Sequence, residues 1–384
     1  MTVMAYQSNG VKVSVPASAS GLGPGVGTLG LGLDLRLDVT FQPIAREGAQ
    51  VSVRGVDELA FPHNEQNLSV KACWLTQDFL GEPRTGLTVS MRNAIPARAG
   101  LGTSVASVVA GVAAAFAMRP DAGDLTSKDF KQQMFSVAAS MLGRQSATAA
   151  SVYGNLVSVW LRQPQDVPSS VVGFPQAITR HNEWIAQAQP VHPAVQAALL
   201  LPAERRRGNL PLGAEPDYGE GTSEPFSRSR ALSNIQRSVL LHSQLTGQNM
   251  PDNQLLFDAT HDAMRLPLLD GALRESVLLV EHLRSQGFAA VLLGSGPAVL
   301  VLHADPDYQR TLARMKDAQE SGSEAWNPYG VGIAPGMWSS SARPAWVNRI
   351  KQLVEHDWLA NKRWSLTYMP LDKNGVQVTP LNAE

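Results

Sequence analysis

Residues 96–104 have the sequence PARAGLGTS, which is the most informative stretch of the chain for predicting the fold. Gly100 and Gly102 let the backbone approach an anion closely, because neither carries a side chain. Thr103 and Ser104 then open an apolar segment of helical length. Backbone N–H groups and the positive end of a helix dipole coincide at such a turn, which predicts a phosphate site. The alternative is an ordinary glycine turn with a Ser/Thr N-cap.

The pattern around this loop predicts strands and helices in two blocks. Strands are expected at 11–15, 35–41, 86–91, 156–161 and within 289–303, and a glycine-rich run follows the first of them at 21–32. Helices are expected at 104–118, 128–143, 229–246, 272–286 and 308–321. Residues 202–228, rich in Gly, Pro, Glu and Ser, predict a long exposed loop. This alternation predicts an α+β protein of two domains.

Composition excludes several classes of protein. Of the 384 residues, 44% are hydrophobic and 17% charged, which suits two packed domains. A net charge of −1 supplies no basic surface for nucleic acid; the short cluster 205–207 is the exception, and a solvated loop is one interpretation of it. Cys73 is the only cysteine, which excludes an intrachain disulfide and favours a cytoplasmic location. No apolar run approaches the roughly 20 residues of a membrane span, so no membrane partner is expected.

Three segments resemble the GHMP kinase family, and its homoserine kinases in particular. Residues 96–104 are similar to the family's phosphate loop, P-x-x-x-G-L-G-S-S-A-A. Residues 15–30 resemble its opening, V-P-A-S-S-A-N-L-G-P-G-F-D-x-L-G, and residues 294–298, GSGPA, resemble its late glycine loop, S-G-S-G-P-T. Shorter similarities at Asn67, Arg207 and 261–265 fall in family order, so the resemblance covers residues 11 to about 302.

The resemblance implies the two-domain GHMP kinase fold and an ATP- and Mg²⁺-dependent kinase. Residues 1–165 would form the nucleotide-binding domain, which is ribosomal protein S5 domain 2-like. Residues 166–384 would form a ferredoxin-like C-terminal domain with a loop insertion near 202–228 and an extra tail of unassigned role. The implied Mg²⁺ ligand is the Ser104 hydroxyl. The implied nucleotide-binding residues are Gly100, Leu101, Gly102, Thr103, Ser104, Asn67, Gly294, Ser295 and Gly296.

The positions that would face Mg²⁺ and the substrate depart from the family pattern. Ser136 stands where the family has a Mg²⁺-binding Glu, and no Asp or Glu occurs between Asp129 and Asp166. Five substrate-facing positions also hold other residue types: Gly21, Gly27, Arg144, Ser146 and Ala147. Mg²⁺ prefers carboxylate and phosphate oxygens, so its positioning by protein groups should be weaker here. No catalytic residue can be assigned.

Arg207 and Arg265 match the family's carboxylate-binding arginines, and Arg144 adds a third positive charge. A guanidinium pairs well with carboxylate, so a small-molecule substrate with an anionic group is expected. Arg207 could instead be a surface residue and Arg265 a helix-terminus residue. The leading expectation is a homoserine-kinase-like phosphotransferase acting on a hydroxyl. The alternatives are a catalytically impaired nucleotide- or metabolite-binding protein on the same fold and a structural partner in an oligomer. A homodimer is compatible with the sequence.

Overall fold

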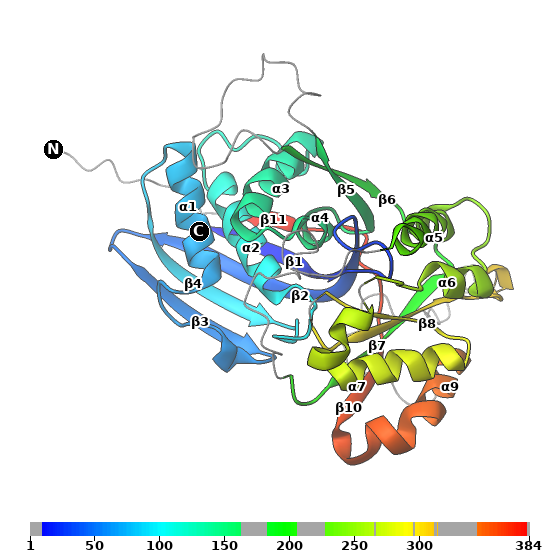
Figure 1. Cartoon of the computed structure of the whole chain (residues 1–384). Coiled ribbons are helices and arrows are strands. Elements are labelled where there is room, and N and C mark those ends of the chain that lie inside the picture. Colours follow the sequence, from blue (N-terminus) through cyan, green and yellow to red (C-terminus); the bar gives the residue numbers. More distant parts are fainter. Residues whose placement is uncertain are drawn as a thin grey trace.

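Two β-sheets with helices packed against them make up the described part of the chain (Figure 1). The structure, a computed structural model, describes residues 10–162, 183–205, 227–264, 266–294, 296–310, 313 and 344–381. The seven-stranded sheet contains β1 (Val11–Ser20), β2 (Leu29–Ile44), β3 (Ala49–Gly55), β4 (Gly86–Asn93), β5 (Leu156–Arg162), β6 (Glu183–Gln189) and β11 (Gln377–Pro380). The four-stranded sheet contains β7 (Val195–Pro202), β8 (Ala289–Leu292), β9 (Val299–Ala304) and β10 (Trp364–Tyr368). The principal helices are α1 (Leu68–Leu80), α2 (Thr103–Ala117), α3 (Lys128–Leu142), α4 (Gln145–Tyr153), α5 (Arg228–Thr246), α6 (Asn253–Ala259), α7 (Leu266–Ser285) and α9 (Ala345–Val354).

The first sheet has the strand order β11-β1-β2-β4-β3, and β5 and β6 extend it from the start of β2. All of its pairs are antiparallel except β3 with β4. Helices α1 to α4 cover one face of this sheet (Figure 1). The arrangement puts the turn from β4 into α2, which contains residues 96–102, at the end of the sheet nearer the second domain.

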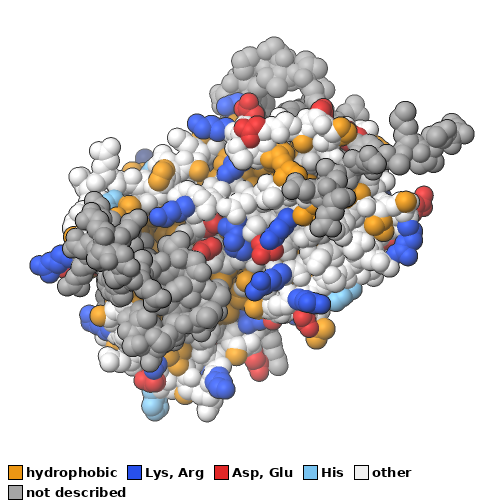
Figure 2. All heavy atoms as spheres, turned by 180° about the vertical axis from the view of Figure 1, so that it is seen from behind, with side chains coloured by type: hydrophobic (Ala, Val, Ile, Leu, Met, Phe, Trp, Pro, Cys, Tyr) orange, Lys and Arg blue, Asp and Glu red, His pale blue; other side chains and the backbone are white. Residues whose placement is uncertain are grey.

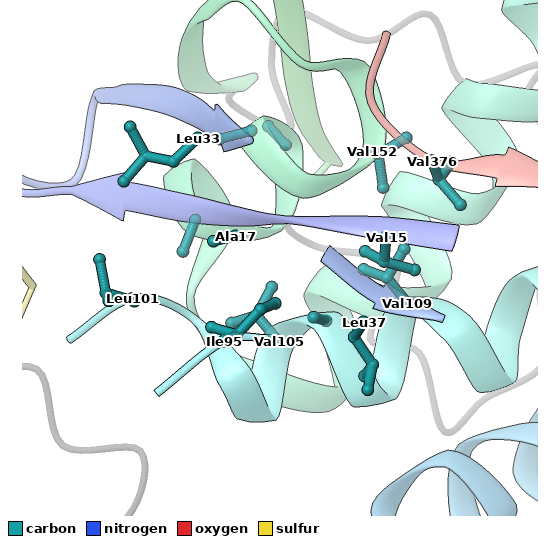
Figure 3. Packing of buried hydrophobic residues seen from close by; sticks show 14 of the residues in the cluster. Val15, Ala17, Leu33, Leu37, Ile95, Leu101, Val105, Val109, Val152 and Val376 are labelled. Carbon is teal, nitrogen blue, oxygen red and sulfur yellow. The ribbon is translucent and has the colours of Figure 1, made fainter. Parts of the chain in front are cut away.

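Helix α2 is the central element of the first core. Residues 105–116 are all buried, as expected for a helix that is apolar on every side. Its alanines and valines allow close packing, and a Cβ on Gly111 would lie 2.2 Å from the backbone oxygen of Ser69 in α1. Figure 3 shows Val105 and Val109 packed in the core that also contains Val15 and Leu37. A helix enclosed in this way holds its N-terminus rigidly.

The second sheet is covered on both faces. Its strand order is β10-β7-β9-β8, all antiparallel. Because side chains alternate along a strand, Ala197 and Leu199 of β7 face the core shared with the first sheet. Ala198 and Leu200 face a separate core against α7 and α9. The two sheets therefore pack through one continuous apolar cluster.

Most of the predicted elements are confirmed, with one correction in the glycine-rich run 21–32. The strands expected at 11–15, 35–41, 86–91 and 156–161 and the helices at 104–118, 128–143, 229–246 and 272–286 lie within observed elements or end within a few residues of them. Strand β2, however, begins at Leu29 rather than after the glycines. Gly30 and Gly32 lie where other backbone approaches closely, since a Cβ on Gly30 would be 2.2 Å from the Ser146 oxygen. Of the helix expected at 308–321, only residues 308–310 and 313 are described, and they are helical.

The C-terminal tail, to which the sequence assigns no role, contributes a strand to each sheet. β10 pairs with β7 in the second sheet, and β11 pairs with β1 in the first. β6 also lies in the first sheet, so the expected division at residue 165 does not coincide with the division between the sheets. On the face shown in Figure 2, acidic and basic side chains of the described residues are interspersed. Among those residues, every helix is too short or too polar to cross a lipid bilayer.

Candidate functional site

The loop between β4 and α2 is fixed at its start by side-chain hydrogen bonds. The buried Asn93 amide donates to the oxygens of Val56 (2.7 Å) and Ile95 (2.8 Å) and accepts from the Ile95 N–H (3.0 Å). The Thr103 hydroxyl, at the first position of α2, donates back to the Pro96 oxygen (3.0 Å). These bonds close the loop on itself and hold its backbone against the sheet.

Three glycine-containing segments from distant parts of the chain meet at this loop. A Cβ on Gly100 would lie 2.4 Å from the Leu293 oxygen, and a Cβ on Gly296 would lie 2.1 Å from the Gly100 nitrogen. Backbone hydrogen bonds join the segments: Ser18 N–H to Leu101 oxygen (3.1 Å), Gly294 N–H to Ser20 oxygen (2.8 Å) and Ala298 N–H to Ala99 oxygen (3.2 Å). The late glycine loop therefore packs beside residues 96–104. Only glycine fits these contacts without backbone movement.

The N-terminus of α2 presents a group of unpaired backbone donors. Gly102 is the N-cap residue, with a left-handed φ of 76°, and the first turn contains no acidic side chain. No acceptor among the described residues pairs with the N–H groups of Gly100, Leu101, Gly102, Thr103 and Ser104. The hydroxyl of the half-buried Ser104 also lacks a partner within the described part. Converging N–H groups at the positive end of a helix are the donor set that a phosphate group needs.

Ser18 supplies a further polar atom beneath this turn. Its side chain is fully buried, and its Oγ has no hydrogen-bond partner among the described residues. A Cβ on Gly102 would lie 2.2 Å from that Oγ. A buried hydroxyl without a partner costs on the order of 1–3 kcal/mol. The residues present therefore fit a bound phosphate, which would complete hydrogen bonds that the protein alone leaves open.

Asn67, also expected to bind the nucleotide, caps α1 in this structure. It is fully buried, its Oδ1 accepts from the Ser69 N–H (2.9 Å), and its Nδ2 donates to the Pro62 oxygen (2.9 Å). A weaker contact joins Nδ2 to the Met91 sulfur (3.4 Å). These contacts support the start of α1. Direct contact with a nucleotide would require this amide to give up one of them.

Between Asp129, in the first turn of α3, and the end of β5, no residue carries a carboxylate that could hold a metal ion. Ser136, half-buried on α3, accepts a hydrogen bond from the Gln132 amide (3.2 Å). Arg144 precedes α4, and its half-buried guanidinium has no partner among the described residues. Ser146 and Ala147 are buried in the first turn of α4. No cluster of three His, Cys, Asp or Glu side chains that could bind a metal occurs in the described ranges. The donor set does not fit a metal ion held by protein carboxylates.

A basic cluster consists of Arg237, His261 and Arg284. Two of its members, His261 and Arg284, lie near Gly21 and Gly23 of the segment 15–30. A cavity of about 20 Å³ is lined by Gly21, Gly23, His261 and Arg284, among others. Burial, and then the charge of Arg237, lower the pKa of Arg284 to about 10, although Asp258 opposes the shift. Partial burial, then Arg237 and Arg284, lower the pKa of His261. Asp262 also lines this cavity and Asp258 lies near Arg284, so this side of the site contains both basic and acidic side chains. The sequence contained no motif that would have identified Arg237 or Arg284.

The Arg284 guanidinium is held by neutral oxygens. It donates to the Thr260 hydroxyl (2.9 Å) and the Phe257 oxygen (2.8 Å) and lies 4.3 Å above the Phe257 ring.

Three of the expected site residues lie outside the described residues: Arg207, Arg265 and Ser295.

A second, larger cavity of about 670 Å³ opens beside the start of the 96–104 loop. Its walls include Asp57, Leu59, Ala97, Arg98 and Arg205. A volume of this size is within the range of small-molecule binding pockets. Arg205, which a solvated loop would leave exposed, is instead half-buried and paired with Asp57. Sequence patterns could not bring these residues together because they come from three separate elements.

Comparisons with known proteins agree with this architecture. Residues 67–155 match the family model described as the GHMP kinases N terminal domain. A homoserine kinase of Leifsonia xyli subsp. xyli is 33% identical over 300 residues, covering 78% of this chain and 81% of the relative. The solved homoserine kinase of Cytophaga hutchinsonii superposes with a TM-score of 0.62 at 18% identity, covering 99% of each chain. A protein denoted MDDEF, solved in complex with MVAPP, AMPPCP and magnesium, gives a TM-score of 0.55 at 14% identity, covering 97% of this chain and 99% of that one.

The two solved structures share the fold of this chain. The sequence identity with the Leifsonia homoserine kinase shows common ancestry. At 33% identity over more than two thirds of both sequences, the chain belongs to the GHMP kinase family and is homologous to homoserine kinases. The resemblance read from residues 15–30, 96–104 and 294–298 is confirmed, as is the expected mixed α+β fold.

Proposed function

We propose that this protein is a homoserine-kinase-like, ATP-dependent phosphotransferase that phosphorylates the hydroxyl of a small anionic metabolite. The observation that carries the proposal is the group of unpaired N–H donors at the N-terminus of α2. Gly100 and Gly296 approach neighbouring backbone, and Gly102 approaches the Ser18 hydroxyl, so closely that no side chain fits at these positions. The nucleotide-binding residues proposed are Gly100, Leu101, Gly102, Thr103, Ser104, Gly294, Ser295 and Gly296, with Asn67 acting through the start of α1.

Mg²⁺ is proposed to enter with the nucleotide, with the Ser104 hydroxyl as its protein ligand. The absence of Asp and Glu between Asp129 and Asp166 supports this arrangement, because phosphate oxygens and water must then supply most of the ligands. The structural relative solved with magnesium and AMPPCP, an ATP analogue, supports the proposal that Mg²⁺ and nucleotide bind together. When bound, the ion neutralises charge on the transferring phosphoryl group. The chain's own contribution is to position the phosphates at α2.

The acceptor is proposed to carry an anionic end held by Arg144, Arg207 and Arg265. The basic cluster supports this charge preference, since Arg284 lines the neighbouring cavity and Arg237 lies close enough to shift its pKa. Homoserine is proposed to be a poor substrate. Its ammonium would meet Arg144, and no carboxylate occurs in the described segment 130–162 to compensate the loss of hydration.

Thermal stabilisation and ADP release test the proposal together. ATP with Mg²⁺ should raise the melting temperature, and ADP should form with hydroxy acids or hydroxylated phosphate esters but not with neutral alcohols. Arg144→Ala should weaken the preference for anionic acceptors. Failure of ATP to stabilise the protein would exclude the nucleotide site. Rapid turnover of homoserine, on the order of 1–10³ per second, would contradict the proposed acceptor.

A catalytically impaired nucleotide-binding protein on the same fold is the second candidate. The observation in its favour is the donor set: no carboxylate occurs from residue 130 to the end of β5, and the described ranges contain no metal-binding cluster. Stabilisation by ATP without ADP release for any acceptor would favour this alternative.

A further inference from the structure

We propose that Asp57 and Arg205 form a positioning pair that fixes the Ala97 peptide and thereby orients the phosphate-binding loop. This inference rests on the proposed nucleotide site, and it assigns a role to two residues outside every motif of that site. Neither side chain is proposed to contact the phosphates. Their proposed effect is on the direction in which the loop presents its N–H groups.

The three residues form a closed set of hydrogen bonds. Asp57 Oδ2 accepts from the Ala97 N–H (2.9 Å), and Arg205 Nε donates to the Ala97 oxygen (3.0 Å). Arg205 Nη2 also donates to both carboxylate oxygens of Asp57 (2.6 and 2.5 Å). Both polar groups of Ala97 are therefore held, one by the anion and one by the cation. Charged hydrogen bonds of this kind are roughly twice as strong as neutral ones.

Each partner comes from a different part of the fold. Asp57 follows β3, Ala97 lies between β4 and α2, and Arg205 follows β7 of the second sheet. The pair thus ties the loop to both sheets at once. The side chains of Arg205 and Asp57 are only 18% and 27% exposed, so solvent screens their attraction less than at an open surface.

The backbone around Asp57 holds the carboxylate in place. Asp57 has a left-handed φ of 52°, a conformation that Asp tolerates better than most residues. The Val56 N–H donates to the Asn93 oxygen (2.8 Å), and a Cβ on Gly55 would lie 2.2 Å from that same oxygen. Asn93 also fixes Ile95 at the entry of the loop. Asn93 therefore fixes both the turn that contains Asp57 and the start of the 96–104 loop.

The location of the pair connects it to ligand binding. Asp57, Ala97 and Arg205 all line the cavity of about 670 Å³, and Ala97 precedes Gly100 by three residues. A rotated peptide at Ala97 would redirect the backbone that leads into Gly100 and Gly102. The pair has no net charge, so its contribution to binding an anion should come from geometry rather than from attraction.

The two opposite charges make a decisive experiment possible, in which ATP affinity is measured by calorimetry for the wild type, Asp57→Ala and Arg205→Ala. If the residues acted only through charge, Arg205→Ala would weaken ATP binding and Asp57→Ala would tighten it. Positioning predicts that both weaken binding, by about tenfold or more, because a misplaced loop loses several hydrogen bonds together. The double variant should be little worse than either single one. Asp57→Asn, which keeps an acceptor for the Ala97 N–H, should give an intermediate affinity.

Arg84→Ala is the matched control, since it breaks an exposed Arg–Asp pair with Asp78 on the same domain. Its ATP affinity should equal that of the wild type. Tighter binding by Asp57→Ala, or unchanged binding by both variants, would overturn the positioning role while leaving the nucleotide site intact. A wild-type protein that does not bind ATP would instead overturn the nucleotide site, and the role of the pair with it.

Discussion

Gly102 combines two constraints that no other residue type can satisfy. Its φ of 76° is left-handed, which costs a residue with a side chain about 1–2 kcal/mol. A Cβ would in addition lie 2.2 Å from the buried Ser18 Oγ. We expect Gly102→Val to displace the start of α2 and weaken ATP binding by about tenfold or more, because the N–H donors no longer converge. Calorimetric titration with ATP and Mg²⁺ measures the loss.

Gly81→Val separates loop geometry from backbone strain. Gly81 ends α1 with a φ of 74°, nearly the value at Gly102, and nothing lies within 4 Å of its ideal Cβ. This variant should lose stability by about 1–2 kcal/mol and bind ATP as the wild type does. Equal losses of affinity in both variants would mean that strain anywhere in the domain impairs binding and that Gly102 has no special role.

At the residue scale, motif reading located the parts of the site that depend on glycine. Gly100, Gly102 and Gly296 could be identified because positions that tolerate only glycine leave a fixed spacing in the sequence. Arg205 and Asp57 could not, because an ion pair between residues 148 positions apart leaves no local pattern. Whether a given arginine is solvated or paired depends on the tertiary structure, and sequence alone favours the solvated alternative.

At the scale of elements, the strongly patterned ones were predictable and the edge strands were not. Helix α2 was evident from its alanine- and valine-rich composition. Strands β10 and β11 are short, with 5 and 4 residues, and their pairing partners β7 and β1 lie far away in the sequence. Short strands are stabilised by the sheet they join rather than by their own propensity, so single-sequence patterns identify them poorly.

His303 of β9 is connected through Trp346 to α9 and β7. Its titration should make the stability of the second sheet depend on pH. Its ring stacks on Trp346 of α9 at a centroid distance of 4.6 Å, and Trp346 Nε1 donates to Gln196 of β7 (2.7 Å). Burial lowers the pKa of His303 to about 4, although Asp305 opposes the shift. The unfolded chain, with an imidazole pKa of about 6.5, binds the proton more tightly. Stability from this group is therefore present above pH 6.5 and is lost as pH falls through about 4.

We expect His303→Phe to reduce the loss of stability on acidification by about 2–3 kcal/mol, since the ring contact with Trp346 stays and the titration disappears. Urea denaturation at about pH 7 and about pH 4 measures the difference. His356→Gln is the control, because that side chain is fully exposed and should change neither value. An unchanged pH profile in His303→Phe would show that His303 is accessible to protons in the folded state.

At the scale of the whole molecule, the C-terminal segment 364–380 connects the two sheets. After β10 the chain leaves the second sheet and crosses to the first. Asp372 N–H donates to the Gly32 oxygen (3.0 Å), and Asp372 oxygen accepts from the Asn155 N–H (2.7 Å). Val376 then packs in the first core with Val152 and Val15 (Figure 3). The segment thus joins β2 and the α4–β5 junction to the second sheet.

The ion pair between Asp372 and Arg36 is the charged contact at the centre of this crossing. The Asp372 side chain is 2% exposed and also accepts from the N–H groups of Asn374 (3.1 Å) and Gly375 (2.6 Å). Burial raises the pKa of Asp372, while Arg36 and these N–H groups oppose the rise. At neutral pH the carboxylate is ionised and fully partnered. Its removal would leave the Arg36 guanidinium, itself 20% exposed, without a counter-ion.

Asp372→Ala should therefore lower the free energy of unfolding by about 3–5 kcal/mol, the cost typical of breaking a buried pair from one side. Urea denaturation at neutral pH, followed by tryptophan fluorescence and by circular dichroism, measures it. Because the segment spans both sheets, the two signals should change together in the wild type and separate in the variant, as the C-terminal crossing between the sheets is weakened. Asp78→Ala, which breaks the exposed pair with Arg84, is the matched control and should cost no more than about 1 kcal/mol. Equal costs for Asp372→Ala and Asp78→Ala would mean that the two sheets are held together by their shared apolar core and that the C-terminal crossing adds little.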